Sequence, residues 1–116
     1  MEHKEITQRP WGRFIVINDE PEYKLKIIEV NPGHRLSYQY HIKRSEVWTI
    51  VKGSGEVIIN GEKSILKYGD CIKINHKSKH RIINNTESLL VFIEVQTGSY
   101  FGEDDIVRIE DDYKRI

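Results

Sequence analysis

The chain has 116 residues, which is enough for one domain with a modest hydrophobic core. Its 18 basic and 18 acidic side chains balance, and no basic run with interleaved aromatic residues occurs, which argues against a nucleic-acid-binding protein. The sequence shows no signal peptide, long apolar stretch or lipidation motif, and its single cysteine, Cys71, fits a reducing compartment. We therefore expect a cytoplasmic protein without a membrane partner.

The predicted elements are strands throughout the chain. Short runs rich in Val, Ile, Tyr and Thr are bounded by Gly, Asn, Asp or Pro, and no window keeps a helical period for three turns. Asn60-Gly61 is a strong signal for a two-residue hairpin turn. Short strands at this turn density predict an all-β sandwich or barrel, with residues 1–116 forming a single domain. The expected strands are 12–18, 23–30, 35–41, 46–51, 56–60, 63–66, 71–74, 80–84 and 89–96.

Side-chain alternation along these strands predicts which residues share a face. If Glu46 points inward, Trp48 and Ile50 do so too, and an inward His80 brings Ile82 with it. Residues 89–95 are apolar on both faces apart from one glutamate, which is typical of a strand that is covered on both sides. We therefore expect a homodimer, formed by pairing sheets or by exchanging the N-terminal strand.

Four residues stand at the spacings of a metal site. Gln39 and His41 are two apart, so on a strand both side chains leave the same face. Glu46 follows after a gap that a hairpin can span, whereas His80 reaches the others only in a closed fold. Two imidazoles, a carboxylate and an amide oxygen suit one borderline divalent ion, with zinc as the first choice and manganese, cobalt, nickel or iron as alternatives. Taken singly, each residue is more often a surface or core residue than a ligand.

The residues that frame these ligands resemble the two motifs of the cupin superfamily, G-(x)5-H-x-H-(x)3,4-E-(x)6-G and G-(x)5-P-x-G-(x)2-H-(x)3-N. Gln39 replaces the first histidine, Asn75 replaces the proline and Lys77 replaces the second glycine. The resemblance implies a cupin fold, which is a double-stranded β-helix or jelly-roll barrel. The two strings in this chain are Gly33-(x)5-Gln39-x-His41-(x)4-Glu46-(x)6-Gly53 and Gly69-(x)5-Asn75-x-Lys77-(x)2-His80-(x)3-Asn84.

A more specific resemblance covers residues 8–115. The strings that carry it include Arg9-Pro10-Trp11-Gly12, Glu94-Val95-Gln96-Thr97-Gly98 and Gly102-Glu103-Asp104-Asp105-Ile106-Val107-Arg108. Through them the chain resembles the type II phosphomannose isomerase domain, which commonly forms the C-terminal half of bifunctional enzymes with an N-terminal mannose-1-phosphate guanylyltransferase. This implies interconversion of mannose 6-phosphate and fructose 6-phosphate through an enediolate. No Gly-rich nucleotide loop occurs, so we expect no nucleotidyltransferase domain.

The implied reaction needs a metal at the C1 and C2 oxygens, a base, cations for the phosphate and an opened sugar ring. Arg44 lies between two ligands and could reach the C1 and C2 oxygens or the phosphate, the alternative being a solvent-exposed arginine at a hairpin tip. Lys43, beside it, is a second candidate for binding substrate. Arg9 and Arg108 could close over the site, or could form structural pairs with acidic residues at 103–105.

Glu94 is the candidate base. A carboxylate in an otherwise apolar strand is costly unless it is paired or functional, and burial would raise its pKa toward the range of a proton-transfer group. A buried ion pair, for example with an arginine, is the alternative explanation.

Two other functions stay open at this point. The family motif usually has a histidine directly after the metal-binding glutamate, where this chain has Val47. That difference favours a sugar-phosphate or sugar-nucleotide binding module without turnover. The cupin scaffold also hosts other metal enzymes, including oxygen-dependent ones.

Overall fold

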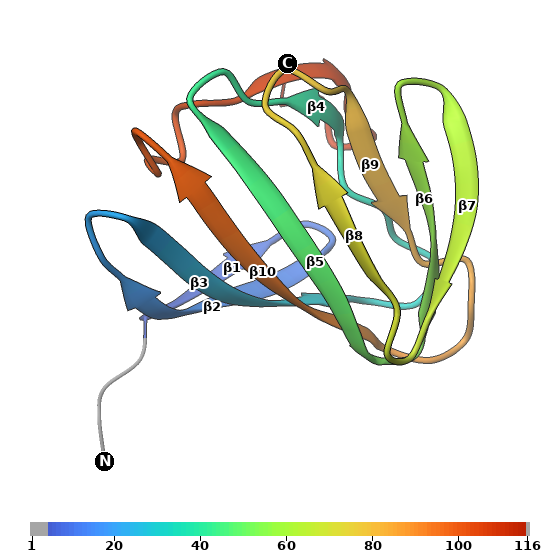
Figure 1. Cartoon of the computed structure of the whole chain (residues 1–116). Coiled ribbons are helices and arrows are strands. Elements are labelled where there is room, and N and C mark those ends of the chain that lie inside the picture. Colours follow the sequence, from blue (N-terminus) through green and yellow to red (C-terminus); the bar gives the residue numbers. More distant parts are fainter. Residues whose placement is uncertain (1–4, 116) are drawn as a thin grey trace.

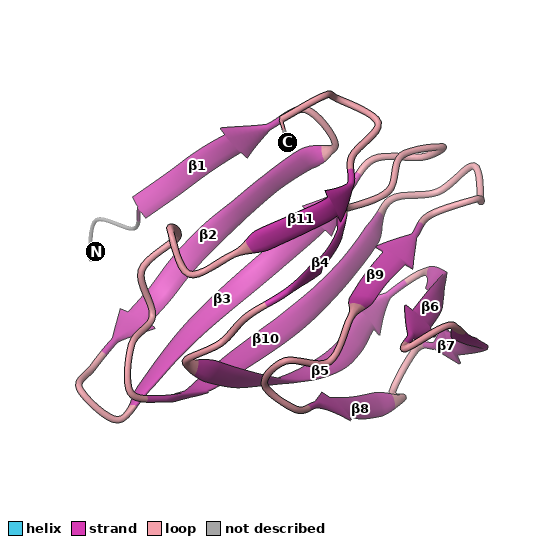
Figure 2. Cartoon of the chain, turned by 90° about the horizontal axis from the view of Figure 1, so that it is seen from above, coloured by secondary structure: helices cyan, strands magenta, loops and turns pink. Residues whose placement is uncertain are grey.

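A computed structural model describes residues 5–115, which form two antiparallel sheets that face each other and enclose a barrel (Figures 1 and 2). None of these residues belongs to a helix that could span a membrane. In spatial order the first sheet contains β1 (Glu5–Arg9), β2 (Gly12–Asp19), β3 (Tyr23–Val30), β10 (Leu90–Gly98), β5 (Arg44–Lys52) and β8 (Cys71–Ile74). The second sheet contains β11 (Val107–Glu110), β4 (Tyr38–Tyr40), β9 (His80–Ile83), β6 (Ser54–Ile59) and β7 (Glu62–Lys67).

The all-β prediction is confirmed, and the strands expected at 23–30 and 71–74 have the predicted bounds. Two strands were missed. β1 contains a single apolar residue, Ile6, and β11 alternates apolar and charged residues that are mostly exposed, so neither gives a strong hydrophobic signal. The strand expected at 35–41 is shorter than predicted because β4 pairs with β9 only through Gln39 and His80.

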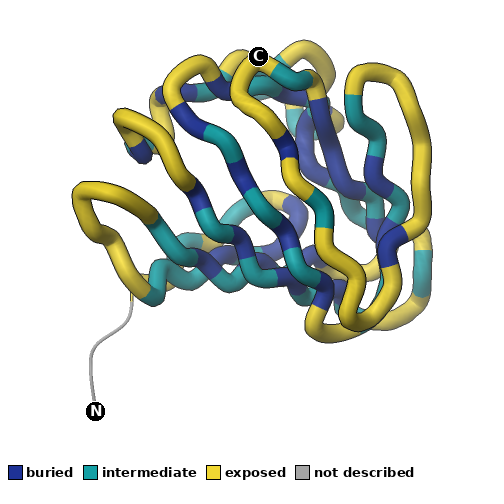
Figure 3. The backbone as a smooth tube through the Cα atoms, viewed as in Figure 1, coloured by how far each residue is buried: buried dark blue, intermediate teal, exposed yellow. Residues whose placement is uncertain are grey.

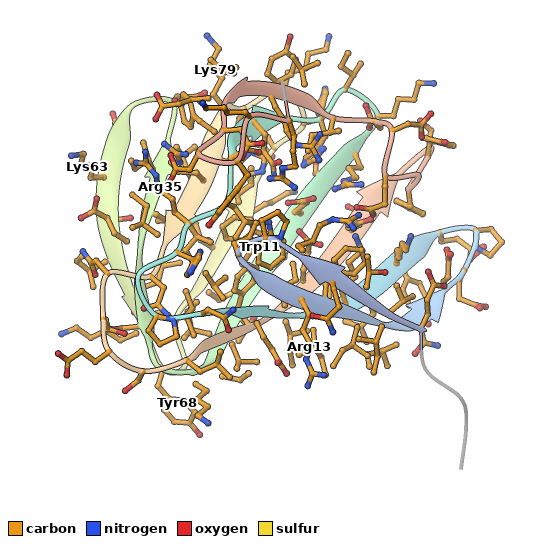
Figure 4. The ribbon with its side chains drawn as sticks, turned by 180° about the vertical axis from the view of Figure 1, so that it is seen from behind. Trp11, Arg13, Arg35, Lys63, Tyr68 and Lys79 are labelled. Atoms are coloured by element: carbon orange, nitrogen blue, oxygen red, sulfur yellow. The ribbon has the colours of Figure 1, made fainter. Side chains whose placement is uncertain are left out.

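The core lies between the sheets, and its alternation is visible along β5 and β10 (Figure 3). Trp48 and Ile50 are buried on the same face as Glu46, and Ile82 is buried with His80, as predicted. The Trp48 ring packs on Phe92 with 4.7 Å between ring centroids. In Figure 4, Trp11 lies among the side chains between the sheets, whereas Arg13 points away from them.

Strand register sets the inward-facing residues of the six-stranded sheet in rows, because paired residues on neighbouring strands point to the same face. One row is apolar and forms part of the core. The next two rows along the strands carry charged and polar side chains, so one end of the barrel interior is polar. The first row contains Phe14, Ile28, Phe92 and Ile50; the second contains Lys26, Glu94 and Trp48 between Val16 and Ile72; the third contains Lys24, Gln96, Glu46 and Ile74.

The outer face of the same sheet is also apolar. A straight row of paired residues crosses it from β1 to β8, and Val91 and Val95 flank this row on β10. These side chains are half-buried or exposed in the single chain. The row consists of Ile6, Ile15, Ile27, Ile93, Thr49 and Cys71.

We expect this outer face to hold a second copy of the chain. Light scattering at micromolar concentration should report a homodimer, and Ile27→Glu should convert it to monomer because a charge would be buried at the interface. Ile65→Glu is the matched control, since Ile65 is 55% exposed on the other sheet. A parent protein that is only monomeric, or a control that dissociates equally, would contradict this prediction.

Candidate metal centre and its cavity

Three of the four predicted ligands converge at the polar end of the barrel. His41 follows β4, Glu46 lies in β5 and His80 begins β9, and one ligand atom from each lies within 4.8 Å of the others. Glu46 Oε2 is 3.4 Å from His41 Nε2, and Glu46 Oε1 is 3.6 Å from His80 Nε2. All three side chains are buried. The closed fold thus brings His80 back to the other two, as the spacing predicted.

Backbone contacts set both imidazoles in the state that binds metal. His41 Nδ1 lies 2.6 Å from the Asp105 carbonyl oxygen, and His80 Nδ1 lies 2.8 Å from that of Ser78. A ring nitrogen that faces a carbonyl oxygen must donate, so each proton sits on Nδ1 and each Nε2 lone pair faces Glu46. Burial also lowers the pKa of His41 to about 4, which keeps this ring neutral at physiological pH.

The same atoms are short of hydrogen-bond partners. Glu46 Oε1 and His80 Nε2 are buried, and neither has a partner among residues 5–115. Burial raises the pKa of Glu46, but its neighbours, among them the Arg44 guanidinium that donates to it, outweigh burial and hold that pKa well below its usual range. An ionised carboxylate oxygen and an imidazole lone pair therefore face each other without a donor. A cation between them would satisfy both, so these residues fit a divalent ion.

Gln39 lies beside this group. It pairs with His80 across β4 and β9, is buried and lines the same cavity as His41. Its Oε1 accepts a hydrogen bond of 2.8 Å from Ser37 Oγ, which leaves the amide oxygen a second lone pair. Gln39 remains the predicted fourth ligand.

Removing one ligand should empty the metal site. His80→Ala is expected to lose most bound metal, since it deletes one of three convergent ligands, and Glu46→Gln should weaken binding by removing the negative charge. His76→Ala is the control, because His76 is exposed outside this cluster. Elemental analysis of the purified variants measures the outcome. Full metal occupancy in the His80→Ala variant would exclude the predicted site, in which His80 is a ligand.

The Arg44 side chain contacts two of the candidate metal ligands, Glu46 and His41. Arg44 begins β5, is only 6% exposed, and its Nε donates to Glu46 Oε2 at 2.9 Å. Its Nη2 lies 3.3 Å from His41 Nε2, and its Nη1 has no hydrogen-bond partner within the described part of the chain. The alternative of a solvent-exposed arginine at a hairpin tip is wrong, because β5 starts two residues earlier than expected. Arg44 thus holds a positive charge beside the ligands.

A cavity opens next to these ligands. It holds about 510 Å³ of empty space, its open side included, and the sequence candidates Arg9, Arg44, Glu94 and Arg108 all line it. The structure does not bring Lys43 to this cavity: its ammonium lies 5.2 Å from the Tyr100 ring centroid, beside a separate depression. The other polar side chains along the cavity are Lys26, Ser37, Gln39, His41, Glu103 and Arg115.

Glu94 lies in the wall of this cavity and is 4% exposed. Its Oε1 accepts from Trp48 Nε1 at 3.0 Å and its Oε2 accepts from Gln96 Nε2 at 2.9 Å. The ion pairs formed among residues 5–115 include none with Glu94, so the predicted alternative of an arginine pair is not found. Burial and the charge of Glu46 raise the pKa of Glu94 to about 7, although Lys26 opposes them. Such a group can accept and return a proton near neutrality.

The cations of the cavity are not all neutralised. Arg44 and Lys26 pair with Glu46 and Glu103, and Arg115 pairs with Asp111 at 2.7 Å.

Arg9 and Arg108 form no ion pair within residues 5–115, so their predicted alternative pairing with residues 103–105 is not found. Arg108 Nε is buried without a partner there, and burial, together with the charges of Arg115 and Arg9, lowers the Arg108 pKa. Arg9, Arg108 and Arg115 form a guanidinium cluster along the cavity. This cluster favours binding of an anion.

Sequence reasoning missed Lys26, Asp105 and Arg115. Lys26 shares a face of β3 with Ile28 and Val30, so the alternation of side chains along this strand could have predicted that Lys26 points into the barrel. Asp105 lies in the segment between β10 and β11, and its carboxylate accepts from the N–H groups of residues 42 and 43 at 3.0 and 2.9 Å. Together with the carbonyl contact to His41, this fixes the ligand-bearing segment. Only the acidic string around residue 105 hinted at such a role.

The family model described as "Mannose-6-phosphate isomerase C-terminal" matches residues 1–111. The chain belongs to this family. Among its relatives, Mannose-1-phosphate guanylyltransferase ManC of Salmonella typhimurium is 42% identical over 114 residues, which are 98% of this chain and 24% of that protein. Alginate biosynthesis protein AlgA of Pseudomonas aeruginosa is 41% identical over 107 residues, which are 92% of this chain and 22% of that protein.

This member of the mannose-6-phosphate isomerase C-terminal family thus spans about a quarter of the length of those relatives.

Solved structures share its fold. KdgF from Halomonas sp. has a TM-score of 0.77 and 19% identity, covering 86% of this chain and 89% of that one. A Klebsiella pneumoniae protein with a double-stranded β-helix domain has a TM-score of 0.73 and 21% identity, covering 83% and 82%. The predicted cupin fold is confirmed.

Proposed function

We propose that this chain is a metal-dependent isomerase that interconverts mannose 6-phosphate and fructose 6-phosphate. The observation that carries the proposal is the shared cavity: a buried carboxylate with a pKa of about 7 lines the same space as His41 and Arg44 of the metal centre. Family membership supports the substrate class, although the relatives that cover this chain are named for guanylyltransferase activity or polysaccharide synthesis.

His41, Glu46 and His80, with Gln39 as fourth ligand, would hold one divalent ion, zinc being the first choice. When bound, the ion supplies Lewis acidity toward the oxygens of the substrate's carbonyl and adjacent hydroxyl groups. Arg44 adds a fixed positive charge beside the same ligands. Its guanidinium would stabilise the negative charge that develops on O1 and O2 in the enediolate.

Glu94 would move the proton. Starting from the open-chain aldose, its carboxylate takes the proton from C2, and the electrons of that C–H bond form the C1–C2 double bond of the enediolate. The electrons of the C1 carbonyl move onto O1, which takes the hydroxyl proton of O2. The carboxylic acid then returns its proton to C1 while the C2 oxygen becomes the carbonyl. The hydrogen bonds from Trp48 and Gln96 fix the carboxyl group during both transfers.

The phosphate would bind at the guanidinium cluster. Arg9 and Arg108 lack a carboxylate partner among residues 5–115, and two uncompensated cations match one phosphate monoester dianion. Arg115, the third guanidinium of the cluster, already shares its charge with Asp111. This arrangement favours a sugar monophosphate over an uncharged sugar.

The unusual Val47 does not argue against catalysis on geometric grounds. It follows Glu46 in β5, pairs with Val95 and Lys73, and so belongs to the outer face of the sheet, opposite to the cavity. A histidine at this position would not line the cavity. The difference from the usual motif therefore leaves the metal ligands and the carboxylate in place.

The proposal is tested by incubating purified, metal-loaded protein with mannose 6-phosphate and measuring fructose 6-phosphate with a coupled enzyme. We expect conversion in both directions. Binding of mannose 6-phosphate without any conversion would replace the isomerase with a sugar-phosphate binding module. Absence of both binding and conversion would exclude this substrate class.

A further inference from the structure

A buried lysine in the cavity has no part in the chemistry described above. Lys26 is 3% exposed and lines the cavity together with Glu94 and Arg44. Register places it directly opposite Glu94 on the neighbouring strand, so both side chains enter the barrel side by side. A lysine is rarely buried this fully, because its ammonium loses hydration that contacts in the protein must replace.

The contacts of Lys26 leave hydrogen-bonding capacity on its ammonium. Nζ donates to Glu103 Oε2 at 2.5 Å and lies 4.1 Å from the ring centroid of Phe14. An ammonium has three N–H donors, and Glu103 takes one of them while the ring occupies another side. Glu103 itself has a side chain that is 43% exposed. Lys26 can therefore donate to a ligand in the cavity without leaving Glu103.

The order of the strands fixes where Lys26 lies relative to the other groups. Glu46 is on β5, Glu94 on β10, Lys26 on β3 and Arg9 on β1, and the strands follow in the order β5, β10, β3, β2, β1. Neighbouring strands lie about 4.8 Å apart. Across this sheet, Lys26 therefore stands between Glu94 and Arg9, whereas Arg108 lies on β11 of the facing sheet, where it pairs with Gln39.

We propose that Lys26 binds the hydroxyl groups in the middle of the substrate's carbon chain, at C3 to C5. The orientation rests on the proposed function, which puts C1 and C2 at the metal centre and the phosphate at Arg9 and Arg108. Along the path from the metal centre to Arg9, the middle of the carbon chain then passes the Lys26 ammonium. Lys26 is thus a specificity-determining residue that distinguishes a polyhydroxylated phosphate from other phosphate monoesters.

The test measures direct binding of two acyclic phosphates by calorimetry. Mannitol 1-phosphate is the reduced, open-chain form of mannose 6-phosphate, hexyl phosphate lacks the hydroxyl groups, and neither can be isomerised. Lys26→Met is expected to weaken mannitol 1-phosphate binding by about tenfold or more, the usual loss for a hydrogen bond to a charged group. Hexyl phosphate binding should change less than about twofold, since the phosphate contacts stay intact.

Lys24→Met is the matched control. Lys24 is on the same strand, and its ammonium also lies 4.0 Å from Glu103, but it does not line the cavity. Its loss should leave the affinities for both probes unchanged. Should Lys26→Met fail to fold, Glu103→Gln serves instead: it releases the ammonium and should raise the affinity for mannitol 1-phosphate relative to hexyl phosphate.

Several results would overturn the inference. Equal weakening of both probes in Lys26→Met would make Lys26 a phosphate ligand, and unchanged binding would make it only a partner of Glu103. An unchanged ratio in Glu103→Gln, or a parent protein that does not bind mannitol 1-phosphate, would also count against it. Because the probes do not react, selective loss in Lys26→Met without turnover of mannose 6-phosphate refutes the isomerase and leaves this inference standing. Turnover of mannose 6-phosphate without selective loss of mannitol 1-phosphate binding in Lys26→Met supports the isomerase and refutes this inference.

Discussion

Glu94→Gln should lower the isomerisation rate by about a thousandfold, within the range that a positioned acid-base group contributes. The amide is nearly isosteric with the carboxyl group. Its oxygen can still accept from Trp48, and its NH2 can donate to the unpartnered Gln96 Oε1 once that amide turns over, so the cavity wall should keep its shape. It cannot take a proton from C2. The coupled assay measures the rate, and calorimetry with mannitol 1-phosphate should show that binding survives.

Glu29→Gln controls for the loss of a carboxylate from this sheet. Glu29 lies on the outer face of β3, paired with Arg13 at 2.7 Å, and its replacement should leave the rate unchanged. If Glu94→Gln isomerises mannose 6-phosphate at the parent rate, Glu94 is not the base. Its burial would then be structural, maintained by Trp48 and Gln96.

Arg44→Ala should lower isomerisation by about a hundredfold, the order expected when one positioned charge is lost from a transition state. Arg44→Lys should recover only part of the loss, because a flexible ammonium does not reproduce the planar guanidinium that contacts both Glu46 and His41. Lys43→Ala is the control and should have little effect, since Lys43 lies outside the cavity.

Metal content must be measured in the same Arg44 variants. The contact between Arg44 and Glu46 joins this arginine to the metal centre, but His41, Glu46 and His80 all remain in Arg44→Ala, so metal should be retained. A parent rate in metal-loaded Arg44→Ala would exclude a catalytic role. A loss of rate that matches a loss of metal would make Arg44 a supporting residue of the metal site.

The candidate metal ligands could be picked out from the sequence because their arrangement depends on local geometry. Gln39 and His41 share a face through the two-residue period of a strand, and Glu46 returns to that face across one tight connection. The same parity gave the inward direction of Trp48 and Ile82. Only the convergence of His80 needed the closed barrel, and the framing motif supplied that information.

The rest of the cavity could not be predicted in this way. Lys26 is held in the cavity by Glu103, which is far away in sequence. Arg115 is held by Asp111, four residues before it, but only the closed fold brings that segment to the cavity. Strand bounds also matter: β5 begins at Arg44, which turned an expected hairpin-tip residue into a buried one. Exclusion of Lys43 from the cavity follows from the same shift.

Stepwise metal addition tests the central claim most directly. The protein is stripped with a chelator, zinc is added in substoichiometric portions, and fructose 6-phosphate formation from mannose 6-phosphate is measured after each portion. The account predicts no turnover without metal, a linear rise with added ion and a plateau at one ion per chain. Turnover by the stripped protein would contradict it, as would absence of turnover at full occupancy with zinc, manganese, cobalt, nickel and iron in turn.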